Sequence, residues 1–503
     1  MSMQSEQRRK RFLLNTATSM LDEVVALVAA FILPRAILGA FGSEVNGLVS
    51  SITQFLGMIS FLDLGVGAVV SSALYKPLAN KDDESVSRIL KSAQRFFRRI
   101  AMIFLVYIAI LIVIYPIVMD LDIFSTIALI LAISITQFAK YYFGVVNQIL
   151  LGSDQRSYIP VSLNVGTVIL NLIFSLILIE LGSPIYMVKL ASSMIFLLRP
   201  IGMGLYVRNH YNVDRNIEIG EEPIKQKWDG MAQHIAGVVM DNTDVTVLTL
   251  FSTLENISVY SVYYTVVHGI RMVVDRLFDG MKSLIGELYA REEKEYLDRI
   301  FREFEFVNHG VVVFFFSCTG VLLVPFIRVY TDGITDADYI APVFAALLAL
   351  SQAVMCLRIP YHMMVKAAGH FRQTQIGAIA ETVINIVVSV VAVNAFGLAG
   401  IAVGTLCAML LRTYYLWIYS FRHLLNRKLS EIIKLTLFDV VVSTLIIVVG
   451  MQFPMKSVSY LSWVVTAFEV CGCGLFITLA ASMLCYRRES VGAVRSLLQK
   501  KRQ

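Results

Sequence analysis

The chain has 503 residues, of which 57% are hydrophobic and 16% are charged, and its net charge is +6. This composition, with a mean hydropathy of +0.70, excludes a soluble globular protein and predicts a membrane protein with many spans. The basic residues are spread over short loops and form no single patch, which argues against nucleic-acid binding.

Fourteen apolar segments are long enough to cross a bilayer, which predicts an all-α polytopic membrane protein with about 14 transmembrane helices. The first follows the basic stretch Arg8–Arg11 without an evident cleavage site, so we expect a transmembrane helix there and not a removable signal peptide. The segments are 12–39, 45–75, 97–119, 123–150, 158–180, 184–207, 228–252, 255–284, 304–328, 339–365, 374–395, 398–420, 431–452 and 458–485.

The distribution of basic residues predicts the orientation of these segments. With the N-terminus inside, 31 of the 43 Lys and Arg residues fall in cytoplasmic segments, and only Arg328 and Lys456 fall in external loops. Basic residues are retained on the cytoplasmic side of membrane proteins. We therefore expect a multi-pass membrane protein with both termini cytoplasmic, which the resemblance described below would place in the bacterial cell membrane.

Two short patterns recur at nearly equal separations. The tetrad Arg88–Lys91 recurs as Arg299–Arg302, 211 residues later, and the pair Asn171 and Ser175 recurs as Asn385 and Ser389. Each match joins a span to the sixth span after it, which predicts two six-helix bundles related by a pseudo-two-fold axis, plus a C-terminal helix pair. The predicted parts are an N-terminal bundle (1–207), a cytoplasmic linker (208–227), a C-terminal bundle (228–420), the extra helices 13 and 14 (421–485) and a basic cytoplasmic tail (486–503).

The first two spans carry the most distinctive local sequence. The stretch Leu33-Pro34-Arg35, the turn Gly42–Leu48 and the motif Asp63-Leu64-Gly65 follow one another there. In this order they resemble the opening hairpin of bacterial polysaccharide flippases, the Wzx-type branch of the multidrug/oligosaccharidyl-lipid/polysaccharide exporter (MOP) superfamily. The resemblance implies a MATE-like fold and a lipid-linked oligosaccharide as substrate.

Several glycines have a structural interpretation that does not depend on the resemblance. We expect Gly42 to end the first helix and turn the chain. We expect Gly65, Gly67, Gly400 and Gly404 to let their helices approach a neighbour closely.

A polar stripe in the eighth span is the strongest functional signal. His268, Arg271, Asp275, Asp279 and Lys282 follow one another at spacings of three and four, which places them on one helix face. The flanking loops are both basic, so this segment must cross the bilayer, and its ionised groups must then face a cavity inside the protein. Alone, the segment would also fit an amphipathic helix on a membrane surface.

Ten cationic residues lie within or near the spans. Arg271 is the first choice for a substrate contact because it is too deep to reach the headgroups, and Arg276, Arg35, Arg358 and His268 follow. The others are expected to extend toward the headgroups. They are Lys140, Lys189, Arg199, Lys282, Arg412 and Lys434.

The carboxylates within the spans suggest an ion-coupled step. Asp241 and Asp244 share one face of the seventh span and have no cation nearby on their own helix, so a raised pKa and a shared proton are expected there. Asp22, Asp63 and Glu381 are further candidates for ion coupling, whereas Asp275 is expected to pair with Arg271 one turn away.

These features together predict a non-enzyme without cofactor or metal site, with proton or sodium coupling left open. The sequence contains no phosphate-binding glycine loop, nucleophile elbow or metal motif, and its six cysteines fit packing roles. The resemblance implies that the substrate is an undecaprenyl-diphosphate-linked oligosaccharide, which we expect to move to the outer leaflet through a cationic central cavity. Membrane lipids and polysaccharide polymerase or assembly proteins are the partners considered. A peptidoglycan-precursor flippase and a proton- or sodium-coupled multidrug antiporter remain alternatives.

Overall fold

A computed structural model of the chain describes residues 3–63, 65–119, 121–214, 217–218, 231–425 and 427–486, without the side chains of 3–9, 12, 118, 231–234, 236 and 429. Within these residues the structure is helical and has no strand, which confirms the predicted all-α class. The predicted tail 486–503, apart from Tyr486, and most of the predicted linker 208–227 lie outside the described residues.

The chain divides into two compact units, Met1–Asn242 and Thr243–Gln503, and the division falls within α8 (Met231–Phe251). The predicted boundaries of the linker and of the C-terminal bundle remain predictions. The first unit contains α1 (Met3–Gly57), η1 (Met58–Asp63), α2 (Val66–Asn80), α3 (Asp83–Met119), α4 (Ile123–Ala139), η2 (Lys140–Gly144), α5 (Val145–Ser153), α6 (Tyr158–Glu180) and α7 (Ile185–His210). The second contains α9 (Leu254–Phe278), α10 (Met281–Ala290), α11 (Lys294–Tyr330), α12 (Pro342–Leu357), α13 (Ile359–Ala367), α14 (Phe371–Phe396), α15 (Leu398–Ser420), η3 (Phe421–Leu425), α16 (Leu429–Gly450) and α17 (Tyr460–Cys485).

Twelve helices in the described part of the chain are long and apolar enough to cross a membrane. The count is below fourteen because the first two predicted spans run together as one stretch, Leu13–Asp63, and because α8 is not among the twelve. Within α1 the backbone breaks at Gly42, which has φ 81° and ψ 179°. This backbone conformation is open mainly to glycine, so Gly42 separates two helical arms, as the sequence predicts.

The order of helix packing recurs in the two units. In the first unit α3 packs on α4, α4 on α7, and α6 on α7. In the second unit the helices at the same places in the sequence, α11, α12, α14 and α15, pack in the same pairs. The repeated side chains Asn171, Ser175, Asn385 and Ser389 are buried in their own units. The recurring pairs agree with the predicted duplication of a six-helix bundle.

Glycine allows the closest of these contacts, between α14 and α15. A Cβ atom on Gly400 would lie 2.3 Å from the main-chain oxygen of Ala392, and one on Gly404 would lie 2.1 Å from Oγ of Ser389. Both distances are too short for a methyl group, so the close approach predicted for these two glycines is confirmed. Gly65 was expected to do the same, but a Cβ atom there would have no neighbour within 4 Å; Gly65 lies at the start of α2 with φ +74°.

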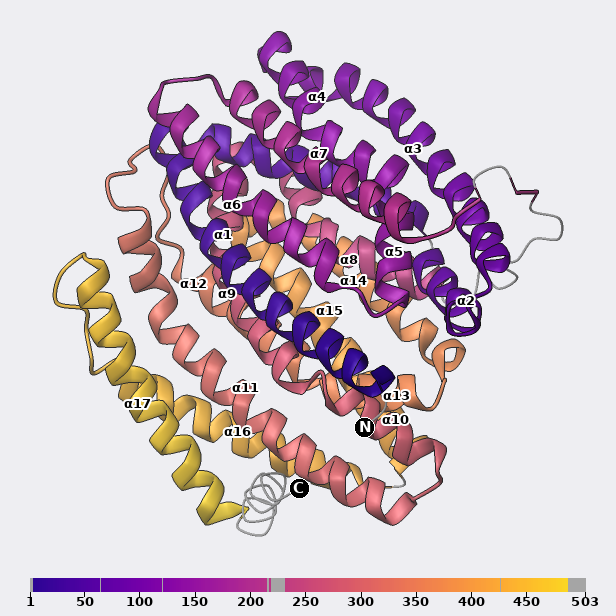
Figure 1. Cartoon of the computed structure of the whole chain (residues 1–503). Coiled ribbons are helices and arrows are strands. Elements are labelled where there is room, and N and C mark those ends of the chain that lie inside the picture. Colours follow the sequence, from indigo (N-terminus) through magenta and orange to yellow (C-terminus); the bar gives the residue numbers. More distant parts are fainter. Residues whose placement is uncertain are drawn as a thin grey trace. The chain divides into compact units, whose positions relative to one another are not determined.

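The last two helices, α16 and α17, pack against each other and against α11 (Figure 1). Their common core includes Val313, Leu322, Val442, Ile446 and Val470. They are the predicted C-terminal helix pair. Among the described residues of the first unit, which ends within α8, no corresponding pair is found.

Candidate functional site

A polar cavity of about 470 Å³ lies within the second unit, between α9, the start of α10, and the corner where α12 meets α13. Five cationic side chains and two carboxylates line it, together with two histidines and apolar side chains that include Met272 and Met355. The cationic residues are Arg271, Arg276, Lys282, Arg358 and Lys366, the carboxylates are Asp275 and Asp279, and the histidines are His268 and His362. The cavity therefore has an excess of positive charge.

The polar stripe of α9 supplies one wall of this cavity. The hydroxyl of Thr253 accepts a hydrogen bond from the main-chain N–H of Asn256 and so caps the start of the helix. The helix ends at Phe278, and the chain turns at Asp279 and Gly280 before α10 begins. The single span predicted over 255–284 is therefore wrong at its end, because Asp and Gly are poor formers of a helix interior. Lys282 consequently lies on α10.

Arg271 is held at the cavity wall by two polar neighbours. Its Nη1 donates to Oε1 of Gln352 on α12 at 3.2 Å, and its Nε lies 3.6 Å from Oδ2 of Asp275. The side chain of Arg271 is 17% exposed, whereas that of Asp275 is 46% exposed. The guanidinium is thus held by two partners at the wall of the cavity and is not fully enclosed.

The other carboxylate of the cavity, Asp279, has two cationic neighbours. Lys282 Nζ lies 2.5 Å from one carboxylate oxygen, and Arg276 Nη1 lies 3.4 Å from the other. All three side chains are well exposed to solvent. Exposed ion pairs of this kind contribute little to stability, so they can exchange partners when an anion enters.

Arg358 forms the opposite corner of the cavity, where α12 ends and Pro360 starts α13. Its Nη1 lies 2.5 Å from Oε1 of Glu381 on α14, and the second carboxylate oxygen lies 3.8 Å from Nε of Arg412 on α15. Arg412 also donates to the main-chain oxygen of Thr374. Arg412 was expected to extend toward the headgroups, but it is only 6% exposed and is turned into the helix packing.

Room for Arg412 comes from a missing side chain on α14. A Cβ atom on Gly377 would lie 2.4 Å from Nη1 of Arg412 and 2.6 Å from the ring of Tyr415. The buried group of Arg358, Glu381 and Arg412 therefore depends on a glycine one turn before the glutamate. The sequence shows the charges but not that Gly377 lets them meet.

A line of aromatic rings on α9 connects the cavity with Asp244. The ring of His268 stacks on that of Tyr264, and Tyr264 stacks on Tyr260, with centroid distances of 5.2 and 5.5 Å. The hydroxyl of Tyr260 donates to Oδ2 of Asp244 at 2.9 Å, and Thr405 donates to the same carboxylate. Asp244 is buried by these contacts in the second unit.

Asn385 continues the cluster at Asp244. Its Nδ2 donates to Oγ1 of Thr405 at 3.1 Å, whereas its Oδ1 is buried without a hydrogen-bond partner among the described residues. Asp241 lies three residues before Asp244 but belongs to the first unit, where its main-chain oxygen accepts from Gln54. Asp241 and Asp244 therefore belong to different units of the chain.

The remaining predicted residues lie in the first unit and do not form one site there. Asp22 accepts a hydrogen bond from Asn164 at 2.8 Å, and Asp63 accepts one from Tyr141 at 3.3 Å. Arg35 is half-buried beside Gly39. Arg199, expected to extend toward the headgroups, instead donates to Asn164 and Gln148.

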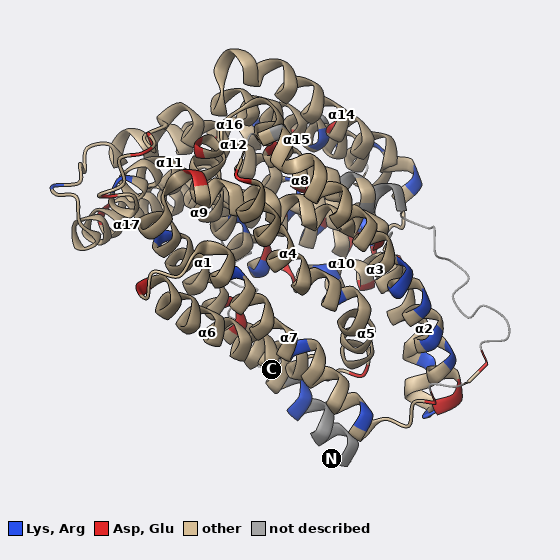
Figure 2. Ribbon diagram, turned by 90° about the horizontal axis from the view of Figure 1, so that it is seen from above, with Lys and Arg blue, Asp and Glu red and all other residues tan. Residues whose placement is uncertain are grey.

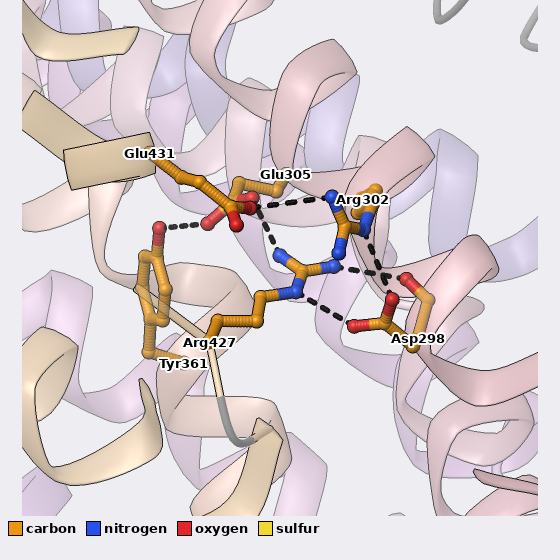
Figure 3. A network of polar contacts seen from close by, with 6 residues as sticks. All are labelled: Asp298, Arg302, Glu305, Tyr361, Arg427 and Glu431. Carbon is orange, nitrogen blue, oxygen red and sulfur yellow. Dashed lines mark hydrogen bonds and ion pairs between the residues drawn. The ribbon is translucent and has the colours of Figure 1, made fainter. Parts of the chain in front are cut away.

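Sequence analysis missed a second polar cluster, which joins α11, α13 and the start of α16 (Figure 3). Arg427, almost completely buried, lies 2.6 Å from Oδ1 of Asp298 and 3.1 Å from Oε2 of Glu305. The hydroxyl of Tyr361 donates to the other oxygen of Glu305. The sequence does contain a pattern that indicates this cluster. Asp298, Arg302 and Glu305 follow one another at spacings of four and three, which places them on one face of α11.

Comparisons with known proteins identify the fold of the chain through solved structures. No family model matches the chain, and no curated protein matches it. Among solved structures, the lipid II flippase MurJ in an inward closed conformation matches with a TM-score of 0.67 and 15% identity, over 94% of this chain and 99% of that chain. The chain has the fold of MurJ.

MATE transporters share this fold. An inward-facing multidrug resistance MATE family transporter of the MOP superfamily matches with a TM-score of 0.56 and 14% identity, over 78% of this chain and 93% of that chain. A mutant of the Vibrio cholerae MATE transporter VcmN matches with a TM-score of 0.58 and 12% identity, over 85% of this chain and 99% of that chain. The predicted MATE-like architecture is therefore confirmed.

Proposed function

We propose that this protein is a flippase that moves an undecaprenyl-diphosphate-linked oligosaccharide from the cytoplasmic to the outer leaflet of a bacterial cell membrane. The observation that carries the proposal is the cavity of the second unit, in which five cationic side chains stand against two carboxylates. Its lining also includes apolar side chains, among them Met272, Met355 and Met363. A cavity of this kind suits an anionic group that carries a bulky polar glycan.

The physical barrier to flipping such a lipid is desolvation of its head. The polyprenyl tail is already in hydrocarbon, whereas moving the diphosphate and the sugars out of water without new partners costs several kcal/mol for each polar group. Arginine suits a diphosphate because its planar guanidinium binds two oxygens at once. We assign this binding to Arg271 and Arg358, with Arg276 and His268 beside them.

The existing contacts of these arginines fit an exchange of partners. Arg271 meets Asp275 at 3.6 Å, which is long for a charge-assisted hydrogen bond. A phosphate oxygen could therefore replace the carboxylate with little loss. Arg358 would keep its ion pair with Glu381 through Nη1 and offer its remaining N–H groups to the ligand.

We further assign Arg35 of the first unit as a substrate contact and alternating access as the mode of transport. The MurJ and MATE folds support a transporter of the MOP superfamily. In an inside-negative cell with both termini cytoplasmic, outward movement of an anion is favoured by about 2.3 kcal/mol per charge per 100 mV. No catalytic group is assigned in this proposal, because flipping forms and breaks no covalent bond.

Asp244 is our first candidate for ion coupling. Its buried carboxylate is surrounded by oxygen-bearing side chains, Tyr260, Thr405 and Asn385, and oxygen ligands suit either a proton or a hard cation such as sodium. Its ring contacts along α9 lead to the cavity. Asp241, Asp22 and Asp63 follow as candidates, and Glu381 is the weakest because two arginines already compensate its charge.

Two other functions have specific support. The similarity to MurJ favours a peptidoglycan-precursor flippase, since that protein is a lipid II flippase. The carboxylate at Asp244 and the MATE neighbours favour a proton- or sodium-coupled multidrug antiporter.

A conditional deletion strain distinguishes the three functions. Lipid-linked oligosaccharide repeat units that accumulate on the inner leaflet, with loss of surface polysaccharide, are the result expected for the proposal. Growth arrest with accumulation of a peptidoglycan precursor would overturn it in favour of the second function. Increased retention of an organic cation with normal surface polysaccharide would overturn it in favour of the third.

A further inference from the structure

The duplicated helices α3 and α11 differ in the residues that contact the charged side chains of their N-terminal halves. Both have 37 residues, and Asp83 and Lys294 at their starts are separated by 211 residues, as are Met119 and Tyr330 at their ends. The same separation joins the tetrads Arg88–Lys91 and Arg299–Arg302. The two helices are therefore equivalent, position by position.

In the second unit the polar face of α11 is neutralised from within the chain. Arg302 meets Asp298 at 2.9 Å and Glu431 of α16 at 3.3 Å, and Glu305 binds Arg427 (Figure 3). One turn further, Nδ1 of His309 lies 2.5 Å from Oδ2 of Asp439 on α16. Helix α16 thus supplies two of the carboxylates at this face, Glu431 and Asp439.

In the described part of the first unit, no such helix pair packs on the equivalent face of α3. At the separation of 211 residues, Arg98 corresponds to His309 and Gln94 to Glu305. Arg95, Arg98 and Arg99 are exposed and form no ion pair with any residue that the structure describes. Figure 2 shows the basic residues along the part of α3 that lies near α2.

These side chains line a groove and not a flat surface. A cavity of about 650 Å³ is bordered by Lys91, Gln94, Arg95, Arg98, Arg99 and the apolar pair Met102 and Ile103. Arg98 is oriented by the ring of Tyr142, whose centroid lies 4.9 Å from its guanidinium carbon. Lys91 is fixed by a hydrogen bond to the main-chain oxygen of Ile217.

The same helix continues directly into an apolar surface. Phe97, Phe104 and Ile108 are buried in the core of the unit, whereas Ile103, Val106 and further apolar side chains on the outer face are exposed. The further exposed side chains are Met102, Leu105, Ile110, Val113, Ile114 and Ile117. The cationic groove is followed within one turn by an apolar strip. This order is complementary to an anionic phospholipid, in which a negatively charged headgroup is followed by hydrocarbon chains.

We propose that this groove of α3 binds the headgroup of an anionic membrane phospholipid, whose phosphate takes the place that carboxylates of α16 occupy in the second unit. Each Lys or Arg near an anionic membrane surface adds about 1 kcal/mol of attraction. The three arginines without an ion-pair partner would therefore favour an anionic over a zwitterionic lipid by on the order of 100-fold. The site is separate from the flipping proposal and does not depend on it.

The experiment compares two triple variants of the full-length protein in nanodiscs. The test variant carries Arg95→Gln, Arg98→Gln and Arg99→Gln, and the control carries Arg291→Gln, Lys294→Gln and Arg299→Gln, which removes the same charge from exposed positions of the second unit. Bound lipid is counted by native mass spectrometry in mixtures of phosphatidylglycerol and phosphatidylcholine. Glycerol phosphate is added in a separate arm as the free headgroup.

The proposal requires that phosphatidylglycerol enrichment falls at least tenfold in the test variant and less than twofold in the control, while glycerol phosphate does not compete at millimolar concentration. Equal losses in the two variants would show only a general effect of surface charge and would overturn it. Competition by glycerol phosphate would overturn the lipid assignment in favour of a site for free phosphate esters. If the test triple does not fold, Arg98→Gln alone is expected to lower the enrichment about fivefold, and no change in that variant would also overturn the proposal.

Discussion

Nη1 of Arg358 lies 2.5 Å from Oε1 of Glu381, so a cation of the cavity wall forms an ion pair with a buried carboxylate of α14. Arg412 approaches the same carboxylate from α15. One buried carboxylate therefore compensates two buried guanidinium groups, and the corner of the cavity is fixed by charge as well as by packing.

Replacement of Glu381 by Gln is expected to destabilise the protein. The variant leaves two mostly buried arginines without an anion, and breaking a buried ion pair from one side costs about 3 kcal/mol. Thermal unfolding in detergent should show a clearly lower Tm. Glu287→Gln is the matched control, because Glu287 pairs with Arg291 on the exposed surface and should cost less than about 1 kcal/mol. Equal Tm values for the two variants would contradict the compensating role.

Replacement of Arg271 by Ala is expected to abolish transport while the protein stays folded in the membrane. The variant removes the bidentate donor of the cavity, and loss of a charge-assisted contact to phosphate should lower the rate at least tenfold. Arg271→Lys should retain part of the activity, since it keeps the charge but not the planar fork. Surface polysaccharide and membrane abundance are measured together, with Arg291→Ala as control. Full activity of Arg271→Ala would refute the assigned role.

Replacement of Gly400 by Ala is expected to separate α14 from α15. The new methyl group would lie 2.3 Å from the main-chain oxygen of Ala392, which cannot move away as a flexible side chain could. Overpacking of this kind costs about 1–3 kcal/mol. Gly472→Ala on α17 provides the control, because a Cβ atom there has no neighbour within 4 Å. Thermal unfolding should show a lower Tm only for Gly400→Ala. A fall in Tm of the same size in both variants would mean that the contact between α14 and α15 is not responsible.

Replacement of Asp244 by Asn is expected to remove the response of transport to an ion gradient. Asn keeps the shape and the hydrogen bonds with Tyr260 and Thr405 but loses the charge that a proton or a cation would bind. Uptake or flipping in reconstituted vesicles is measured with and without a pH or sodium gradient. Asp122→Asn is the control, since Asn caps a helix start as well as Asp does. An unchanged gradient dependence in Asp244→Asn would exclude this carboxylate as the coupling group.

The predicted orientation can be tested with single cysteines. Lys456 lies in the loop between α16 and α17, and Arg422 lies in η3; both are exposed. In a variant without the native cysteines, Lys456→Cys should react with an impermeant maleimide in intact cells, and Arg422→Cys only after the cells are opened. The reverse pattern would place both termini outside.

The sequence alone determined the membrane class, the helical architecture, the duplication and the charged stripe of α9. These features depend on hydropathy and on helical spacing, which are local properties of the chain. The expectation for Arg271 at a cavity came from the same reasoning, because a deep charge requires a polar surrounding.

Only the tertiary structure decided which charges are partners. Arg412 and Arg199 looked like residues that extend to the headgroups, but they turn inward because Gly377 leaves space for Arg412 and because Asn164 and Gln148 accept from Arg199. Likewise, nothing local in the sequence reveals that Arg427 meets Glu305, 122 residues earlier. A hydrogen bond or ion pair depends on distances of a few ångströms between helices remote in the chain, and those distances are set by packing.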